Sequence, residues 1–207
     1  YTPQYLETYN TWVSACWDQA DAGSPTTTAT SFGASNWGST GFLNDGSGVG
    51  AVKINLYTTG TEDWMVSPTF DLSAGGPWEL KIEAGVTGWN STAAQPMGSD
   101  DMVQVVVSTD GGATWSVLHT WDATNQPSVN GEFLQLDLSA YTGTSNIFAI
   151  WAYDGTVNDP EDFDFHIGSF EIKEAAADDL AMLNVTTSAS TGCNLSNSET
   201  VTIQFKN

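Results

Sequence analysis

Apolar and polar residues alternate in short runs along most of the chain, and Gly, Ser and Thr separate these runs. A period of two residues is typical of β-strands, because successive side chains of a strand point to opposite faces of the sheet. Helical periodicity is nearly absent. The pattern therefore predicts an all-β protein whose strands are Tyr5–Tyr9, Ala51–Tyr57, Trp64–Ser67, Trp78–Gly85, Met102–Ser108, Trp115–Trp121, Glu132–Leu138, Asn146–Tyr153 and Phe163–Lys173.

Two of these strands indicate which faces they bury. In Met102–Ser108 the apolar residues Val103, Val105 and Val107 share one face. The strand Asn146–Tyr153 is apolar on both faces, which predicts a central strand covered on both sides.

The chain changes character near Glu174–Asp178, where an Ala-rich segment follows the last of these strands. Two further strands, Leu180–Val185 and Glu199–Phe205, come after it, and two strands are too few for a complete domain. We therefore predict a sandwich domain over residues 1–174 and the N-terminal part of a second β domain, Ig-like, over residues 178–207. Since the sequence starts without Met and stops within a strand pattern, we expect a piece of a longer exported multidomain protein.

The charge is strongly one-sided. The chain has 25 acidic residues, four lysines and no arginine, and its formal net charge is −21. Such a chain repels nucleic-acid phosphates and anionic membrane surfaces, so we expect neither as a partner. No apolar run is long enough to insert into a membrane. Bound calcium would offset the self-repulsion of the acids, and a solvated acidic surface is the alternative.

Only two cysteines are present, Cys16 and Cys193, far apart in the sequence. A disulfide between the two predicted domains and two buried free thiols both fit this pair, and we favour the thiols.

Several motifs resemble, in order, those of MAM-like, cleaved-adhesin or "choice-of-anchor" domains of exported Bacteroidota proteins, including the adhesin regions of gingipain-type proteases. The run from Thr61 to Ser73 resembles their DWLxSPxxDLS signature. Further similarities are the opening strand at Leu6–Tyr9, the STDGGxTW hairpin at Ser108–Trp115, the IDLSxY strand end at Leu136–Tyr141 and the closing strand at Asp164–Phe170. The resemblance implies a jelly roll of two antiparallel sheets, an adhesive or substrate-binding role and structural calcium. Residues 178–207, with Thr191–Leu195, resemble the start of an Ig-like repeat.

Acidic residues cluster at three places that could hold a cation, since calcium accepts six to eight oxygen ligands from loops. By the resemblance, one calcium would be held by Asp63, by Asp100 or Asp101, and by Asp162 or Asp164. A second calcium would be held by Glu7 and Asp21, but Gly168 and Ser169 stand where the family has its last acidic ligand.

No pattern in the sequence supports catalysis. Paired carboxylates can hydrolyse glycosides, but nothing singles out an acid–base pair among so many acids. Nucleophile-elbow, zinc-protease and phosphate-loop motifs are missing, and His119 and His166 lie in predicted strands as structural residues. The run from Ser108 to Trp115 also fits the Asp-box of sialidases, which we interpret as a structural hairpin clip in which Asp110 caps turn N–H groups.

Aromatic residues are the best candidates for ligand binding, because sugar rings stack on Trp and Tyr while Asp and Asn bind their hydroxyls. Trp89 and Asn90 lie together in a long polar loop and rank first; Trp121 and Tyr153 end strands and rank second. Most other tryptophans, such as Trp64, Trp78, Trp115 and Trp151, fit buried positions. We therefore expect a secreted or surface-attached bacterial module without catalytic activity that binds an extracellular glycan or protein. The alternatives are a carbohydrate-binding accessory domain of a secreted enzyme or protease, and a rigid spacer in a surface filament.

Overall fold

The computed structural model describes residues 1–57, 59–156, 161–176, 181–187 and 201–206. The chain forms two compact units, Tyr1–Glu174 and Ala175–Asn207. The second unit is described by one antiparallel pair, β13 (Ala181–Thr187) and β14 (Val201–Lys206), close to the two strands that the sequence predicts. Its Ig-like identity stays a prediction, and Cys193 lies outside the described residues.

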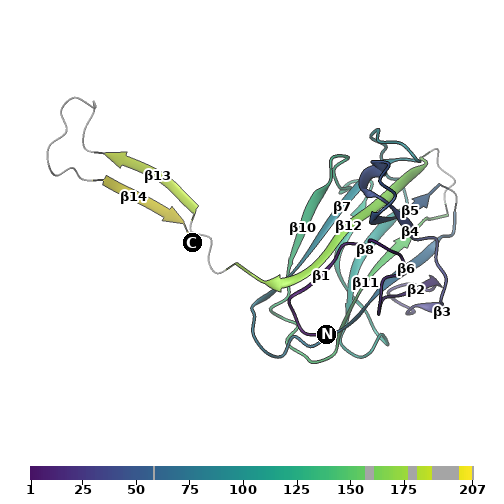
Figure 1. Ribbon diagram of the computed structural model, residues 1–207, viewed down its shortest axis with the longest axis horizontal. Helices are drawn as coiled ribbons and strands as arrows, with labels where there is room; N and C mark the ends of the chain where they lie inside the picture. Colours follow the sequence, from purple (N-terminus) through teal and green to yellow (C-terminus); the bar gives the residue numbers. More distant parts are fainter. Residues whose placement is uncertain (58, 157–160, 177–180, 188–200, 207) are drawn as a thin grey trace. The chain divides into compact units, whose positions relative to one another are not determined.

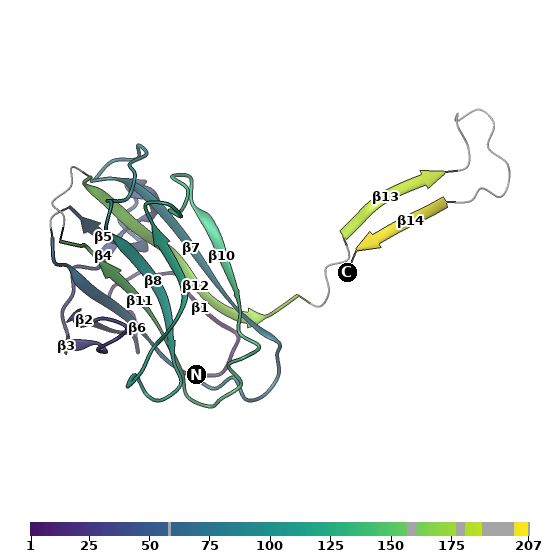
Figure 2. The same ribbon diagram turned by 180° about the vertical axis from the view of Figure 1, so that it is seen from behind.

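The first unit is a sandwich of two antiparallel sheets, and Figures 1 and 2 show these two layers from opposite sides. Sheet 1 contains, in order, β10 (Glu132–Asp137), β7 (Trp78–Gly88), β12 (Phe163–Glu174), β5 (Gly50–Leu56) and β4 (Gly38–Gly41), with β1 (Tyr5–Glu7) paired to the last part of β12. Sheet 2 contains β3 (Thr30–Phe32), β2 (Asp18–Ala22), β6 (Glu62–Phe70), β11 (Asn146–Tyr153), β8 (Met102–Ser108) and β9 (Ser116–Asp122). The all-β, two-sheet architecture that the sequence predicts is confirmed.

The main core fills the space between the sheets. Val103, Val105 and Val107 of β8 all face it, as their spacing predicts, and Ile54 of β5 and Phe165 of β12 meet them from sheet 1. Removing this apolar surface from water is the dominant favourable contribution to folding.

A second, smaller core lies on the outer face of sheet 2. Trp64, Val106, Ala149 and Trp151 form it, under the segment that begins at Gly23. The indole N–H groups of Trp64 and Trp151 both donate to the carbonyl oxygen of Gly23, at 3.2 Å and 3.0 Å, and so hold that segment over the sheet. Strand β11 is therefore buried on both faces, which confirms its predicted central position.

A one-turn segment, η1 (Phe42–Asn44), covers part of the outer face of sheet 1. A Cβ atom at Gly131 would lie 2.7 Å from Cε1 of Phe42, and one at Gly168 would lie 3.0 Å from its Cδ2. A side chain at Gly131 would therefore displace the Phe42 ring, and one at Gly168 would also displace the Glu83 carboxylate, whose Oε2 would lie 2.6 Å from its Cβ atom.

Three short strands differ from the sequence prediction. Strands β2, β3 and β4 lack an alternating apolar pattern and are not among the predicted strands. Cys16 is exposed, which corrects the expectation of a buried thiol at that position.

Candidate functional site

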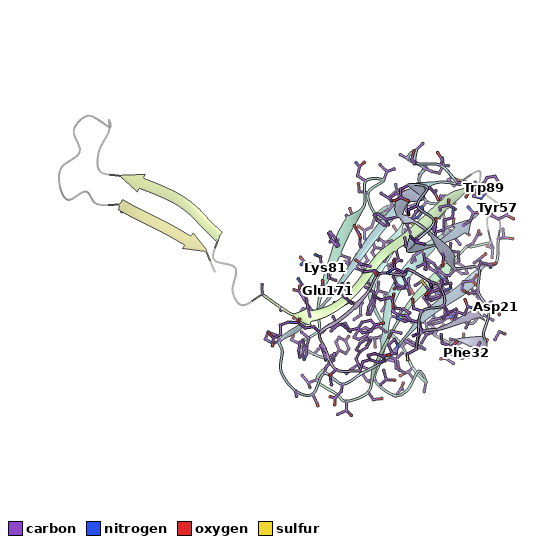
Figure 3. The ribbon with its side chains drawn as sticks, viewed as in Figure 1. Asp21, Phe32, Tyr57, Lys81, Trp89 and Glu171 are labelled. Atoms are coloured by element: carbon purple, nitrogen blue, oxygen red, sulfur yellow. The ribbon has the colours of Figure 1, made fainter. Side chains whose placement is uncertain are left out.

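Two large aromatic side chains are exposed at one end of the sandwich. Trp89 is 59% exposed and Tyr57 is 56% exposed, and Figure 3 shows both at the same end of the first unit. They directly follow Gly88 and Leu56, which both pair with Phe163 of β12. Neighbouring strands lie about 4.8 Å apart, so the two aromatic residues emerge about 10 Å apart, one on each side of β12. We call Tyr57, Trp89 and Asn90 the strand-end surface.

The backbone beneath these exposed side chains is held firmly. The Trp89 N–H donates to the carbonyl oxygen of Asp162 at 3.1 Å. The Tyr57 N–H donates to Oδ2 of Asp154 at 2.9 Å. Both aromatic rings are therefore solvent-accessible on a fixed backbone, which lowers the entropy that a ligand would have to remove on binding.

Asn90 adopts a backbone conformation that L-residues rarely take, with φ of 47°. Its N–H donates to Oδ2 of Asp164 at 2.8 Å, and its side-chain Oδ1 accepts from Nζ of Lys53 at 2.8 Å. Residues held in sparsely populated conformations concentrate at functional sites, where surrounding contacts maintain them. The contacts to Asp164 and Lys53 fix Asn90, and with it the adjacent Trp89.

A buried polar network supports this conformation. Asp164 is fully buried, and its Oδ2 accepts from Nζ of Lys53 at 2.7 Å and from Nδ2 of Asn44 at 2.9 Å, as well as from Asn90. The Lys53 ammonium in turn donates to Oδ1 of Asn44 at 2.9 Å. The Lys53 ammonium is thus surrounded by oxygen acceptors from three segments, those of Asn44, Asn90 and Asp164, and it compensates the Asp164 carboxylate.

His166 lies beside the network on β12. Its Nε2 lies 3.0 Å from Oγ1 of Thr87, and its ring packs edge-on against Phe42. The pKa of His166 is lowered to about 4. Burial is the main cause, the Asp164 charge opposes it, and the Lys53 charge makes a smaller contribution in the same direction as burial. The imidazole is therefore neutral at neutral pH. Its burial and its contacts fit a structural role, as the sequence predicts.

A polar pocket of about 420 Å³ opens next to Asn90. Hydroxyl, amide and ammonium groups line it, from Ser39, Thr40, Asn44, Lys53 and Asn90. Together, the strand-end surface and this polar pocket offer flat apolar rings beside a group of hydrogen-bonding side chains.

The predicted calcium ligands do not come together around one position. Asp63 lies in sheet 2 and is 1% exposed, with Oδ1 accepting from the Asn36 N–H at 2.6 Å and Oδ2 from its Nδ2 at 2.9 Å. Burial raises the pKa of Asp63, and the two Asn36 hydrogen bonds oppose the rise. Asp162 and Asp164 belong to the β12 side of sheet 1, where Asp162 accepts from Nδ2 of Asn55 at 2.9 Å.

The remaining candidates are engaged elsewhere. Asp100 and Asp101 accept backbone N–H bonds from Thr156 and Gly155, at 2.8 Å and 3.1 Å. Glu7 accepts from the N–H of Tyr9 at 2.8 Å. Asp21 is exposed on β2, and its charge raises the pKa of Asp63.

These contacts leave the predicted calcium sites untested. Among the described residues, no three His, Cys, Asp or Glu side chains form a group that could hold a metal ion. The carboxylate of Asp164 is compensated by an ammonium, and that of Asp63 is occupied by one asparagine on both oxygens. Calcium binding stays a prediction of the sequence and has no part in the site described here.

The predicted ligand-binding residues separate into three environments. Trp89 and Asn90 are part of the strand-end surface. Trp121 is only 2% exposed and packs against Phe165 in the main core, so it has no face for a ligand, and its prediction as a binding residue is corrected. Tyr153 lies on the outer face of sheet 2, stacked on Trp151.

Three residues that contribute to this site were not predicted from the sequence: Tyr57, Lys53 and Asn44. Tyr57 is the last residue of a predicted strand, and such a strand end is a signal that could have indicated it. The pairing of Lys53 with Asp164 joins residues 111 positions apart, and no local pattern indicates it.

The predicted hairpin clip is confirmed as structural. Oδ1 of Asp110 accepts from the N–H groups of Ala113 and Thr114, at 3.1 Å and 2.9 Å, and its Oδ2 accepts from the Thr114 hydroxyl. The Thr114 hydrogen bonds, with others from Ser108 and Ala113, lower the pKa of Asp110 to about 2. The Trp115 ring then packs against Trp64.

No protein-family model and no curated protein sequence matches the chain. Among solved structures, it is similar to the K1 cleaved adhesin domain of Lys-gingipain from Porphyromonas gingivalis, at 18% identity and a TM-score of 0.53, over 84% of this chain and 99% of that one. The K3 cleaved adhesin domain of the same protease matches at 15% identity and a TM-score of 0.47, over 78% of this chain and 94% of that one. A carbohydrate-binding module, TmCBM61 in complex with β-1,4-galactotriose, matches at 10% identity and a TM-score of 0.46, over 78% of this chain and 90% of that one. The last two scores are too low to carry an argument. No described helix is long and apolar enough to cross a membrane. The first unit has the two-sheet sandwich fold of the K1 cleaved adhesin domain.

Proposed function

We propose that this protein is a non-catalytic module of an exported or surface-attached protein, and that it binds a glycan through the strand-end surface. The observation that carries the proposal is the pair of exposed aromatic residues, Tyr57 and Trp89, on a fixed backbone at one end of the sandwich. Tyr and Trp each combine a large apolar ring with a polar group, which suits them to binding faces.

The chemistry of the surroundings favours a sugar. A pyranose ring presents C–H groups that stack on Trp and Tyr, and its hydroxyl groups need donors and acceptors nearby. The polar pocket beside Asn90 supplies both kinds of group, from Ser39, Thr40 and Asn44. A protein ligand would bury a larger apolar area than two separated rings provide.

A role in adhesion and a role as a carbohydrate-binding accessory domain both follow from the same glycan-binding surface. They differ in the parent protein rather than in the site. A passive spacer does not require exposed aromatic side chains next to a strained, well-anchored asparagine, so the strand-end surface favours binding over a purely mechanical role.

A glycan array followed by titration calorimetry tests the proposal. The native chain is expected to bind at least one neutral oligosaccharide. Trp89→Ala and Tyr57→Ala should each weaken that binding by about tenfold or more, because stacking on one aromatic ring contributes about 1–3 kcal/mol in comparable ring–ring contacts.

The matched control is Phe133→Ala, which removes a ring that is 54% exposed on β10 of sheet 1. This variant should bind as the native chain does. If the native chain bound no glycan, or if Trp89→Ala and Phe133→Ala behaved alike, the proposal would be wrong.

A further inference from the structure

A second pocket lies on the outer face of sheet 2, at a place that the strand-end surface does not include. It has a volume of about 410 Å³ and is lined by side chains of β6, β8, β9 and β11 together with the segment after Gly23. This volume lies within the range of small-molecule sites and exceeds what one extended side chain would fill. Six of the eight residues that line the pocket are Ser24, Glu62, Gln104, Val117, Trp151 and Tyr153.

Two aromatic side chains, Trp151 and Tyr153, line this pocket, and their rings have centroids 5.3 Å apart and planes inclined by 20°. Trp151 is only 6% exposed, packs against Trp64 and directs its indole N–H to the Gly23 carbonyl oxygen, so it is mainly the half-buried Tyr153 ring that a ligand can reach. The face of an aromatic ring attracts both C–H groups and cations.

The polar groups of the pocket are placed by the register of the sheet. Glu62 is directly opposite Tyr153, and Gln104 is directly opposite Trp151. Oε2 of Glu62 accepts from the Gly23 N–H at 3.1 Å, and Nε2 of Gln104 donates to Thr120 at 3.1 Å. These contacts orient both side chains and leave Oε1 of each as an acceptor for a ligand.

The charge around the pocket has one sign. Glu62 contributes a carboxyl group, and within the described residues sheet 2 contains no lysine. The sequence has no arginine, and Lys53 and Lys173 are paired with Asp164 and Glu79 in sheet 1. A carboxylate or sulfate on a ligand would find no lysine or arginine in sheet 2, whereas a ligand cation would find the Glu62 carboxyl group and the Tyr153 ring.

We propose that this pocket binds a sugar that carries a free, positively charged amino group. The ring of the sugar lies on Tyr153, its ammonium faces Oε1 of Glu62, and a hydroxyl group donates to Oε1 of Gln104. The pocket is a second site in addition to the strand-end surface, and it does not depend on whether that surface binds a glycan.

Calorimetric titration of the full chain with a glucosamine tetramer and with its N-acetylated counterpart tests the proposal, at a pH that keeps the amines protonated. The free-amine form is expected to bind about tenfold more tightly, because acetylation removes the charge that Glu62 and the Tyr153 ring attract. Added salt should weaken the binding of the free-amine form and leave the other form nearly unchanged. A galacturonate tetramer, which carries negative charges, should bind more weakly than both.

The variant Glu62→Gln keeps a carbonyl acceptor for the Gly23 N–H and removes the charge, so the preference for the amine form should fall to about twofold or less. Glu171→Gln removes one negative charge from the outer face of sheet 1, at the position labelled in Figure 3, and should keep the full preference. Thermal melting of each variant shows that the fold is retained.

The proposal is overturned if the native chain binds both tetramers equally, or if Glu62→Gln retains the preference. It is also overturned if a lysine-rich peptide displaces the glucosamine tetramer at lower concentration than glucosamine itself does. That result would assign the pocket to a protein side chain.

Discussion

The ammonium of Lys53 lies 2.7 Å from Oδ2 of Asp164, and the two side chains connect β5 to β12 beneath the loop that carries Trp89. Asp164 is fully buried, and the Lys53 side chain is 20% exposed. The same ammonium contacts the side chains of Asn44 and Asn90. One cation therefore both compensates a buried carboxylate and fixes the asparagine next to the exposed tryptophan.

We predict that Lys53→Met destabilises the first unit by about 3 kcal/mol, because it leaves the Asp164 carboxylate buried without its cation. Urea unfolding measures this change. The double variant Lys53→Met with Asp164→Asn should recover part of the loss, since it also removes the uncompensated charge. Lys81→Met is the matched control: Lys81 lies over the Phe133 ring at 3.9 Å on the outer face, and its loss should change stability by less than about 1 kcal/mol.

The pH dependence of stability should reveal His166. Its pKa is lowered to about 4 in the folded protein, mainly by burial, while an unfolded histidine titrates near 6.5. As the pH falls below about 6.5, the unfolded chain binds a proton that the folded chain does not. The free energy of unfolding should therefore decrease between about pH 6.5 and pH 4, by about 3 kcal/mol in total. Chemical unfolding at several pH values measures it, and His166→Gln should flatten this part of the profile; an equal slope in the variant would contradict the assignment.

The sequence predicts the core strands because their alternation follows directly from burial on one face or on both. Val103, Val105 and Val107 face the core as their spacing requires, and Asn146–Tyr153 is covered on both sides. Strands β2, β3 and β4 could not be predicted, because short polar strands take their structure from the neighbour with which they pair rather than from their own residues.

The candidate site could be predicted only where it depends on local sequence. Trp89 and Asn90 lie in a polar loop, and the loop position indicated their exposure. Trp121 has the same kind of position at a strand end, yet its strand turns it into the core. The residues that donate hydrogen bonds to Asp164 lie far from it in the sequence. The acidic cluster around Asp164 therefore does not by itself indicate that Lys53 compensates the Asp164 carboxylate.

The hairpin clip predicts a local loss of stability in Asp110→Ala. This change removes the acceptor of the Ala113 and Thr114 N–H groups and of the Thr114 hydroxyl, so the turn between β8 and β9 should loosen. Thermal melting should show a lower melting temperature than that of the native chain, and hydrogen exchange should rise at residues 111–114. Because the pKa of Asp110 is lowered to about 2, the contribution of the clip is present above about pH 4 and is lost as the pH falls toward 2. Asp21→Ala, at an exposed carboxylate on β2, is the control and should melt at or slightly above the native temperature.

Chelation tests the calcium that the acidic composition predicts. Both carboxylate oxygens of Asp63 already accept hydrogen bonds from Asn36, and Oδ2 of Asp164 accepts from Lys53, so an ion at these oxygens would compete with those donors. We therefore expect the melting temperatures in excess calcium and in excess chelator to agree within about 2 °C, a difference that corresponds to less than about 1 kcal/mol for a domain of this size. Magnesium serves as the control for ionic strength. A fall of ten degrees or more on chelation that only calcium restores would contradict this expectation, because stabilisation of that size requires an ion held by several oxygen ligands in the folded state.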